Sequence, residues 1–107
     1  MIASFLVSLK RIFGLTPPEP DLEARRLVDE GAYLLDVRSP GEYSGGHLDG
    51  SLNIPVQKLG EQVGELDTSR AVVVYCRSGM RSRSAASMLE AKGFDVYDLG
   101  RMSAWGA

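Results

Sequence analysis

The stretch from Ala71 to Ser82 constrains the fold more than any other, because two kinds of structure meet within it. Residues 71–75 form a short, β-branched apolar run, which is typical of a strand buried on both faces of a parallel sheet. From Ser82 onward, apolar residues recur at helical spacing until Gly93, where a glycine commonly ends a helix. The pattern predicts a strand, a tight loop and a helix, with Cys76 where the strand ends.

Cys76 lies where a thiol becomes reactive. The N–H groups of such a loop and of the first helical turn are unpaired, and the helix dipole favours an anion such as a thiolate. Arg77 and Arg81 flank the loop, and Gly79 allows a backbone conformation that a Cβ would obstruct. We therefore interpret Cys76 as a nucleophile. The alternative is a small buried apolar residue, as many free cysteines are.

The sequence indicates no partner base for this thiol. A cysteine hydrolase needs a histidine beside its nucleophile, and the only histidine, His47, lies in a glycine-containing turn that the sequence does not place near Cys76. A nucleophile without a base suits a reaction whose leaving group needs no proton, such as transfer of a sulfane sulfur.

Length and composition narrow the class of protein. A chain of 107 residues forms one compact domain rather than two. Its formal net charge of −2 argues against general nucleic-acid binding. The single cysteine excludes an internal disulfide and any multi-cysteine metal site, and it fits a reducing compartment, so we expect a cytoplasmic protein.

The first fifteen residues predict an amphipathic helix, because their large apolar side chains share one helical face. The basic pair Lys10 and Arg11 follows the apolar run, which argues against a cleaved signal, and the run is too short to span a bilayer. Three roles stay open: packing on the domain, peripheral contact with a membrane surface, or binding a partner or second copy. Residues 16–20 predict a stiff proline-rich linker to a domain over 21–107.

The domain alternates predicted strands with predicted helices. Asp21 is the expected N-cap of a helix with an apolar stripe of Leu22, Leu27 and Val28 that ends at Gly31. The expected strands are residues 32–37, 51–54, 71–75 and 95–99, and short helices are expected after Ser39 and over 56–63. This alternation predicts an α/β fold with a mostly parallel central sheet and helices on both faces. Its site is expected at the carboxyl ends of the strands.

Two separated motifs resemble the rhodanese (thiosulfate sulfurtransferase) domain. One is the loop Cys76-Arg77-Ser78-Gly79-Met80-Arg81-Ser82, and the other is the block over residues 35–55, which contains Asp36-Val37-Arg38, Gly46-His47 and Asn53-Ile54-Pro55. The resemblance covers residues 22–105 and implies a single domain around a five-stranded sheet. It also implies that Glu42, His47 and Asn53 are mainly architectural.

The resemblance implies a chemistry as well. Cys76 would carry a persulfide, with Arg77, Ser78, Gly79, Met80 and Arg81 as the substrate-binding loop. Asp36 and Arg38 would support that loop. The implied partners are a small anionic sulfur donor (thiosulfate or a persulfide) and an acceptor that is a thiol or protein thiol. No metal and no organic cofactor is implied.

Two rival functions belong to other classes. Phosphatases and arsenate reductases related to this family have a loop one residue longer, with an arginine six positions after the cysteine, where this chain has Ser82. The second rival is a non-catalytic binding module of the same fold. The chain also departs from the family's closing segment, because Arg101 stands where the family has a second glycine. We expect a different local turn there, or an added cation that assists anionic substrates.

Overall fold

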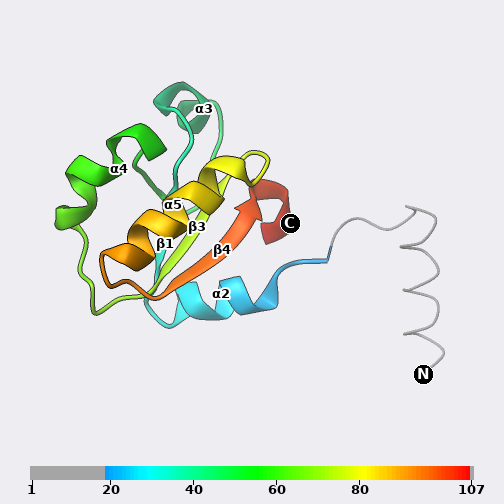
Figure 1. The fold of residues 1–107 in the computed structure, drawn as a ribbon. Coiled ribbons are helices and arrows are strands. Elements are labelled where there is room, and N and C mark those ends of the chain that lie inside the picture. The colour runs from blue at the N-terminus through cyan, green and yellow to red at the C-terminus, as the bar shows by residue number, and fades with distance from the viewer. Residues whose placement is uncertain (1–18, 107) are drawn as a thin grey trace.

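The computed structural model of the protein describes residues 19–106. The elements are, in chain order, α2 (Leu22–Asp29), β1 (Tyr33–Asp36), α3 (Pro40–Ser44), β2 (Leu52–Asn53), α4 (Val56–Gln62), η1 (Val63–Glu65), β3 (Val72–Cys76), α5 (Met80–Ala91), β4 (Val96–Arg101) and η2 (Met102–Trp105) (Figure 1). The helix expected over residues 1–15 lies outside the described residues, as does most of the linker expected over 16–20.

The sheet is parallel throughout, with the strand order β2-β1-β3-β4. This arrangement confirms the predicted α/β class and the parallel sheet. The expectation of five strands is wrong, because the described chain forms a sheet of four strands. Each of these four corresponds to one of the four apolar runs in the sequence, and the fifth had no run of its own.

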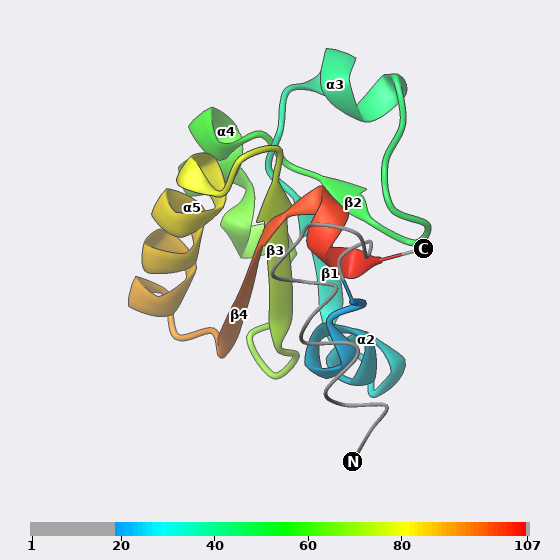
Figure 2. The same cartoon turned by 90° about the vertical axis from the view of Figure 1, so that its right-hand side faces the viewer.

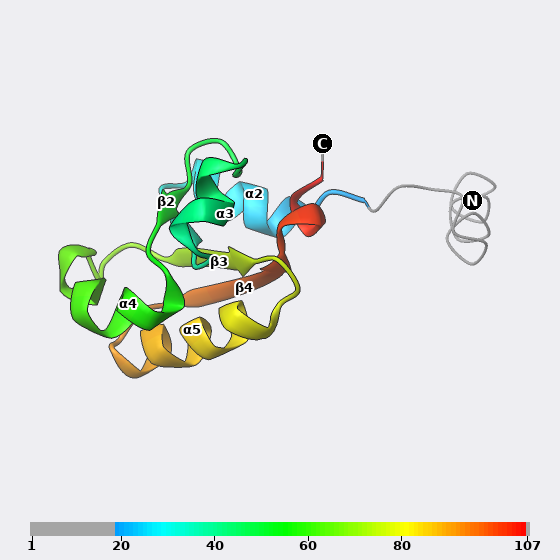
Figure 3. The ribbon, with the colours of Figure 1, turned by 90° about the horizontal axis from the view of Figure 1, so that it is seen from above.

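Helices cover both faces of the sheet. Helices α4 and α5 lie against one face, whereas α2 and the turn η2 lie on the other (Figures 2 and 3). The short helix α3 stands beyond the carboxyl ends of the strands (Figure 2). None of the helices within residues 19–106 is both long enough and apolar enough to cross a bilayer.

Capping residues fix the helix ends as the sequence predicts. The Asp21 carboxylate accepts a hydrogen bond from the Ala24 N–H at 3.0 Å, and Gly31 follows α2 with φ +108°. Gly93 follows α5 in the same way, with φ +95°. One prediction for α2 was wrong: Leu22 is 72% exposed and does not belong to the buried stripe. It lies two residues before the buried Ala24, which puts it on the opposite side of the helix.

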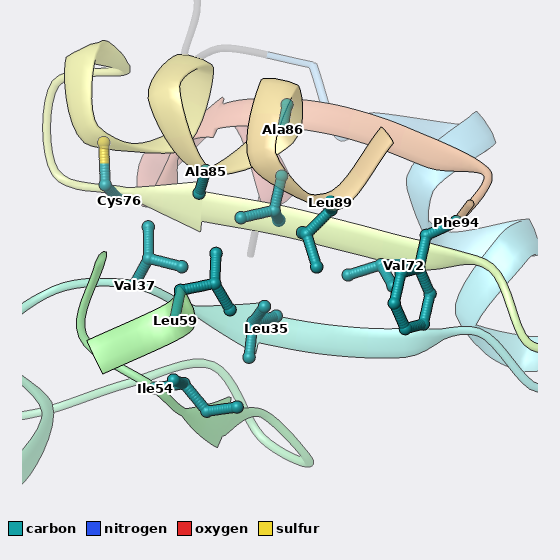
Figure 4. Packing of buried hydrophobic residues seen from close by; sticks show 11 residues of the cluster. Leu35, Val37, Ile54, Leu59, Val72, Cys76, Ala85, Ala86, Leu89 and Phe94 are labelled. Carbon is teal, nitrogen blue, oxygen red and sulfur yellow. The ribbon is translucent and has the colours of Figure 1, made fainter. Parts of the chain in front are cut away.

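The core between the sheet and helices α4 and α5 consists mostly of buried aliphatic side chains (Figure 4). Leu35 and Val72 contribute from the strands, and Leu59 and Leu89 from the helices. Burial of each such side chain stabilises the fold by roughly 1.5–3 kcal/mol. Cys76 belongs to this same cluster, so the packing that holds β3 against α5 also fixes the position of its sulfur.

The strand order creates one place where chain connections diverge. From β1 the chain continues to β2 on one side, whereas β3 lies on the other side of β1 and is followed by β4. In open α/β sheets a crevice forms at the carboxyl ends of strands around such a switch point. Asp36 ends β1 and Cys76 ends β3, so both lie at this point.

Candidate active site

Cys76 is the last residue of β3 and has no exposed surface. Its sulfur points toward the first turn of α5, as Figure 4 shows. Residues 77–79 form a tight loop, and α5 begins at Met80. The structure therefore contains the strand, loop and helix that the sequence predicts, with the thiol at their junction.

Two backbone N–H groups point at the Cys76 sulfur. The Gly79 nitrogen lies 3.0 Å from Sγ, and the Ser82 nitrogen lies 3.4 Å from it. Gly79 is the N-cap of α5 and has φ +102°, a conformation that side chains disfavour. The glycine thus allows the chain to curl around the sulfur and aim N–H groups inward, which makes a cradle for negative charge.

This cradle lowers the pKa of the thiol. Burial raises the pKa of Cys76, but hydrogen bonds from Ser82, Gly79 and Ser78 together outweigh burial, so the pKa lies below its ordinary value. The lowered pKa increases the thiolate fraction at neutral pH. The lowering comes mainly from hydrogen bonds of the loop and first helical turn, whose N–H groups the sequence argument had named beside the helix dipole and the flanking arginines.

Ser82 is a residue of the site that sequence reasoning missed. It is fully buried, and its hydroxyl lies 3.1 Å from the Gly79 carbonyl and 3.3 Å from the Gly100 carbonyl. Ser82 therefore ties the loop to β4 while its N–H contacts Cys76. The sequence did contain a signal for this role. Helical spacing assigns position 82 to the buried face of α5, yet the residue there is a small polar one.

Arg81 forms a bidentate ion pair with Glu42 of α3. Its two Nη atoms lie 2.6 and 3.1 Å from the two carboxylate oxygens. Glu42 also forms a capping box with Ser39. The Ser39 N–H donates to the Glu42 carboxylate, and the Glu42 N–H donates to the Ser39 hydroxyl oxygen. The ion pair therefore fixes α3 over the start of α5.

The same pair has two electrostatic consequences. The hydrogen bond from Arg81, followed by that from the Ser39 N–H, lowers the pKa of Glu42 from 4.5 to about 2. The pKa of Arg81 is raised, chiefly by Glu42 and to a smaller extent by the negative charge of Cys76. Glu42 thus neutralises much of the charge that Arg81 was expected to offer a donor. The prediction that Glu42 is architectural agrees with this geometry.

Asp36 and Arg38 form a buried ion pair at the end of β1. The Arg38 Nη2 lies 2.7 Å from Asp36 Oδ2, and the side chains are 7% and 0% exposed, respectively. Hydrogen bonds to Asp36 raise the pKa of Arg38, against the opposing effect of burial. Arg38 also donates to the Gly46 carbonyl at 2.7 Å and lies over the Tyr75 ring. The pair therefore supports the ends of both strands beside Cys76.

The remaining loop residues face solvent. Arg77, Ser78 and Met80 are exposed, and Met80 is 80% exposed. Arg77 lines a groove of about 440 Å³ with residues of α3 and η2. Ser78, Gly79 and Met80 line a second groove of about 540 Å³, which runs along β4. The loop that holds Cys76 thus separates two surface grooves.

His47 packs against Tyr43 of α3. Its ring stacks on Tyr43 with 3.7 Å between centroids, and Nδ1 lies 2.8 Å from the Tyr43 carbonyl. These contacts give it a structural role in the turn before β2. Within residues 19–106, no three histidine, cysteine, aspartate or glutamate side chains gather where a metal ion could bind.

The backbone at Arg101 suits any residue. It has φ −99° and ψ 145°, an extended conformation that any residue adopts. The preceding Gly100 takes the positive φ of +85°. The position of this segment that needs a positive φ is Gly100, and there the chain keeps a glycine.

Fold and site together define a class: an α/β domain in which a loop at the carboxyl end of a central strand surrounds a cysteine thiol of lowered pKa. The comparisons specify the family. The family model for the rhodanese-like domain matches residues 21–107. The chain therefore belongs to the rhodanese-like domain family, as its two motifs indicated.

Individual relatives support this assignment. The chain is 36% identical over 108 residues to the uncharacterized protein YqhL of Bacillus subtilis, a match that covers 99% of this chain and 82% of that protein. It is 35% identical over 95 residues to the thiosulfate sulfurtransferase GlpE of Pseudomonas syringae, with 87% of each chain covered. The human single-domain sulfurtransferase TSTD1 superposes with a TM-score of 0.66 at 27% identity, over 83% of this chain and 91% of that one.

Proposed function

We propose that the protein is a sulfurtransferase that moves a sulfane sulfur from thiosulfate or a persulfide donor to a thiophilic acceptor, through a persulfide on Cys76. The observation that carries the proposal is the pair of N–H groups from Gly79 and Ser82 on a thiol of lowered pKa. Relatives such as GlpE, which is named a thiosulfate sulfurtransferase, support the same reaction class.

The first half-reaction needs a nucleophile and no acid. The Cys76 thiolate attacks the outer sulfur of thiosulfate, a new sulfur–sulfur bond forms, and the bond to the sulfite sulfur breaks. Sulfite leaves with the electron pair and needs no proton. This chemistry suits a site whose thiol receives hydrogen bonds from backbone N–H groups and whose only histidine is occupied elsewhere.

The second half-reaction returns the enzyme to its starting state. An acceptor thiolate attacks the outer sulfur of the Cys76 persulfide, and the Cys76 thiolate leaves. With cyanide as acceptor the product is thiocyanate. The persulfide is an anion, and the N–H groups of the loop from Arg77 to Arg81 would hold it, as those of Gly79 and Ser82 contact the Cys76 sulfur. No metal or organic cofactor takes part in either step.

Access to the sulfur requires movement of the groups that cover it, since Cys76 has no exposed surface. The exposed Arg77 would attract the anionic donor, whereas Arg81, paired with Glu42, would position the start of α5. The supporting role of Asp36 and Arg38 would be indirect, through Tyr75 and Gly46. We place the protein in the cytoplasm, with membrane or protein contact through residues 1–15 as a further proposal.

Steady-state kinetics test this function. Thiocyanate formation from thiosulfate and cyanide should follow a ping-pong pattern, with parallel lines in double-reciprocal plots. The Cys76→Ser variant should be inactive, whereas Ser84→Ala, on the exposed face of α5, should match the wild type.

The rival functions predict other results. Hydrolysis of p-nitrophenyl phosphate that depends on Cys76 would favour the oxyanion enzyme. Absence of both activities in a folded protein would favour the binding module.

A further inference from the structure

The groove along β4 begins at the Cys76 loop. Its volume is about 540 Å³, and the loop residues Ser78, Gly79 and Met80 form one wall. Arg83 of α5 and Arg101 of β4 line it as well. A space of this size exceeds what a sulfur donor as small as thiosulfate fills. The groove therefore has room for a larger molecule whose reactive end reaches the loop.

A bulge in β4 brings Arg101 beside the cysteine. The pairing of β3 with β4 shifts between Val74 and Tyr75, so that Tyr75 lies opposite Gly100 and Cys76 opposite Arg101. Bulges of this kind redirect the side chains that follow them. In a parallel pair, residues in register present their side chains to the same face of the sheet. The bulge and the positive φ of Gly100 thus put Arg101 in register with Cys76, on the same face of the sheet.

The two arginines of this groove differ from Arg38 and Arg81, two other arginines near the site. Arg38 and Arg81 are each paired with a carboxylate. Within residues 19–106, the guanidinium groups of Arg83 and Arg101 form no ion pair or hydrogen bond, and both residues are exposed. The groove contains one carboxylate, that of Asp98, which accepts a hydrogen bond from the Gly100 N–H at 2.9 Å. The groove lining therefore carries two positive charges against one negative charge.

We propose that this groove selects the acceptor: it binds thiols of low molecular mass that carry a carboxylate, with Arg101 as the main contact for the carboxylate and Arg83 as a second one. A carboxylate on Arg101 would lie beside the outer sulfur of the persulfide, with the acceptor thiol directed at the loop. Exposed Met80 and the side chain of Ala104 supply apolar surface for the body of such a molecule. This inference rests on the proposed sulfur transfer.

The test measures the acceptor half-reaction alone. Protein preloaded with sulfur by thiosulfate and then desalted is mixed with N-acetylcysteine or with its amide, which lacks the carboxylate. Loss of the persulfide is followed by mass spectrometry. For Arg101→Gln we expect the rate constant with N-acetylcysteine to fall about fivefold to tenfold, as loss of an exposed charge-assisted hydrogen bond implies. The rate with the amide should not change.

Two controls separate this effect from others. Lys92→Gln removes the same charge at the far end of α5 and should leave both rates as they are. Loading by thiosulfate should proceed in Arg101→Gln as in the wild type. An equal fall with both acceptors would overturn the inference, because it would indicate a change in loop geometry. Slower loading with unchanged acceptor discrimination would also overturn it, because Arg101 would then serve the donor.

A binding measurement distinguishes failure of this inference from failure of the proposed function. S-methyl-N-acetylcysteine cannot accept sulfur, and its binding is followed by NMR shifts of backbone amides. Shifts at Gly100 and Arg101 that disappear in Arg101→Gln would support the groove even in a protein that transfers no sulfur. Absence of these shifts in the wild type would overturn the inference whatever the protein catalyses.

Discussion

Replacement of Asp36 by asparagine should destabilise the protein strongly, because it leaves the Arg38 guanidinium buried without a counter-charge. Arg38 is 6% exposed, and its Nε and Nη2 both contact the Asp36 carboxylate within 3.1 Å. Breaking a buried pair from one side typically costs about 3–5 kcal/mol. The Gly46 carbonyl and the Tyr75 ring remain as partners, so we expect the lower end of that range, about 3 kcal/mol.

The assay is urea unfolding followed by circular dichroism, with Asp36→Asn, Arg38→Met and the double variant measured together. The double variant should lose less stability than the sum of the single variants, because it leaves no charge unpaired. The control is Arg26→Gln, since Arg26 pairs with Glu23 and Glu30 on the exposed face of α2. A loss for Asp36→Asn no larger than that for Arg26→Gln would refute the reasoning, because the buried pair would then behave as a surface pair.

Three further changes have expected outcomes. Gly60→Ala should stabilise the fold by about 0.5–1 kcal/mol in urea unfolding, because the residue lies within α4 and an added Cβ fits there in ordinary contact. Glu42→Gln should lower stability at neutral pH, and its difference from the wild type should shrink as the pH falls from 4.5 through 2, since the folded-state pKa is about 2. A difference at pH 2 as large as that at pH 7 would contradict this. Ser82→Ala should move the pH midpoint of Cys76 alkylation by iodoacetamide upward, whereas Ser84→Ala should not move it.

The local structure around Cys76 could be predicted because it depends on residues that are close in sequence. A β-branched run predicted β3, and helical spacing followed by Gly93 predicted α5. Capping by Asp21 was equally local, since the acceptor and donor are three residues apart. Such patterns specify backbone geometry directly, and the position of the thiol follows from that geometry.

Contacts between distant residues could not be predicted in the same way. Arg81 and Glu42 are 39 residues apart, and no spacing rule joins them. The resemblance implied that Arg81 belongs to the substrate-binding loop, but nothing in the sequence indicated its ion pair with Glu42 of α3. The packing of α3 over α5 decides this, and it depends on the whole sheet.

The register of β4 against β3 could not be predicted from the sequence either. A one-residue bulge between the pairs of Val74 and Tyr75 brings Arg101 opposite Cys76. Without the bulge the side chain of Arg101 would face the other side of the sheet, because strand side chains alternate. The sequence showed a departure from a motif, but only the pairing shows where its side chain is placed.

Intact mass spectrometry after incubation with thiosulfate tests the central claim most directly. The wild type should gain one sulfur, about 32 Da, as expected for persulfidation, and cyanide should remove it. The Cys76→Ser variant should gain nothing under the same conditions. A wild-type protein that stays at its original mass, while its thiol is free and reacts with iodoacetamide, would contradict sulfur transfer from thiosulfate through Cys76.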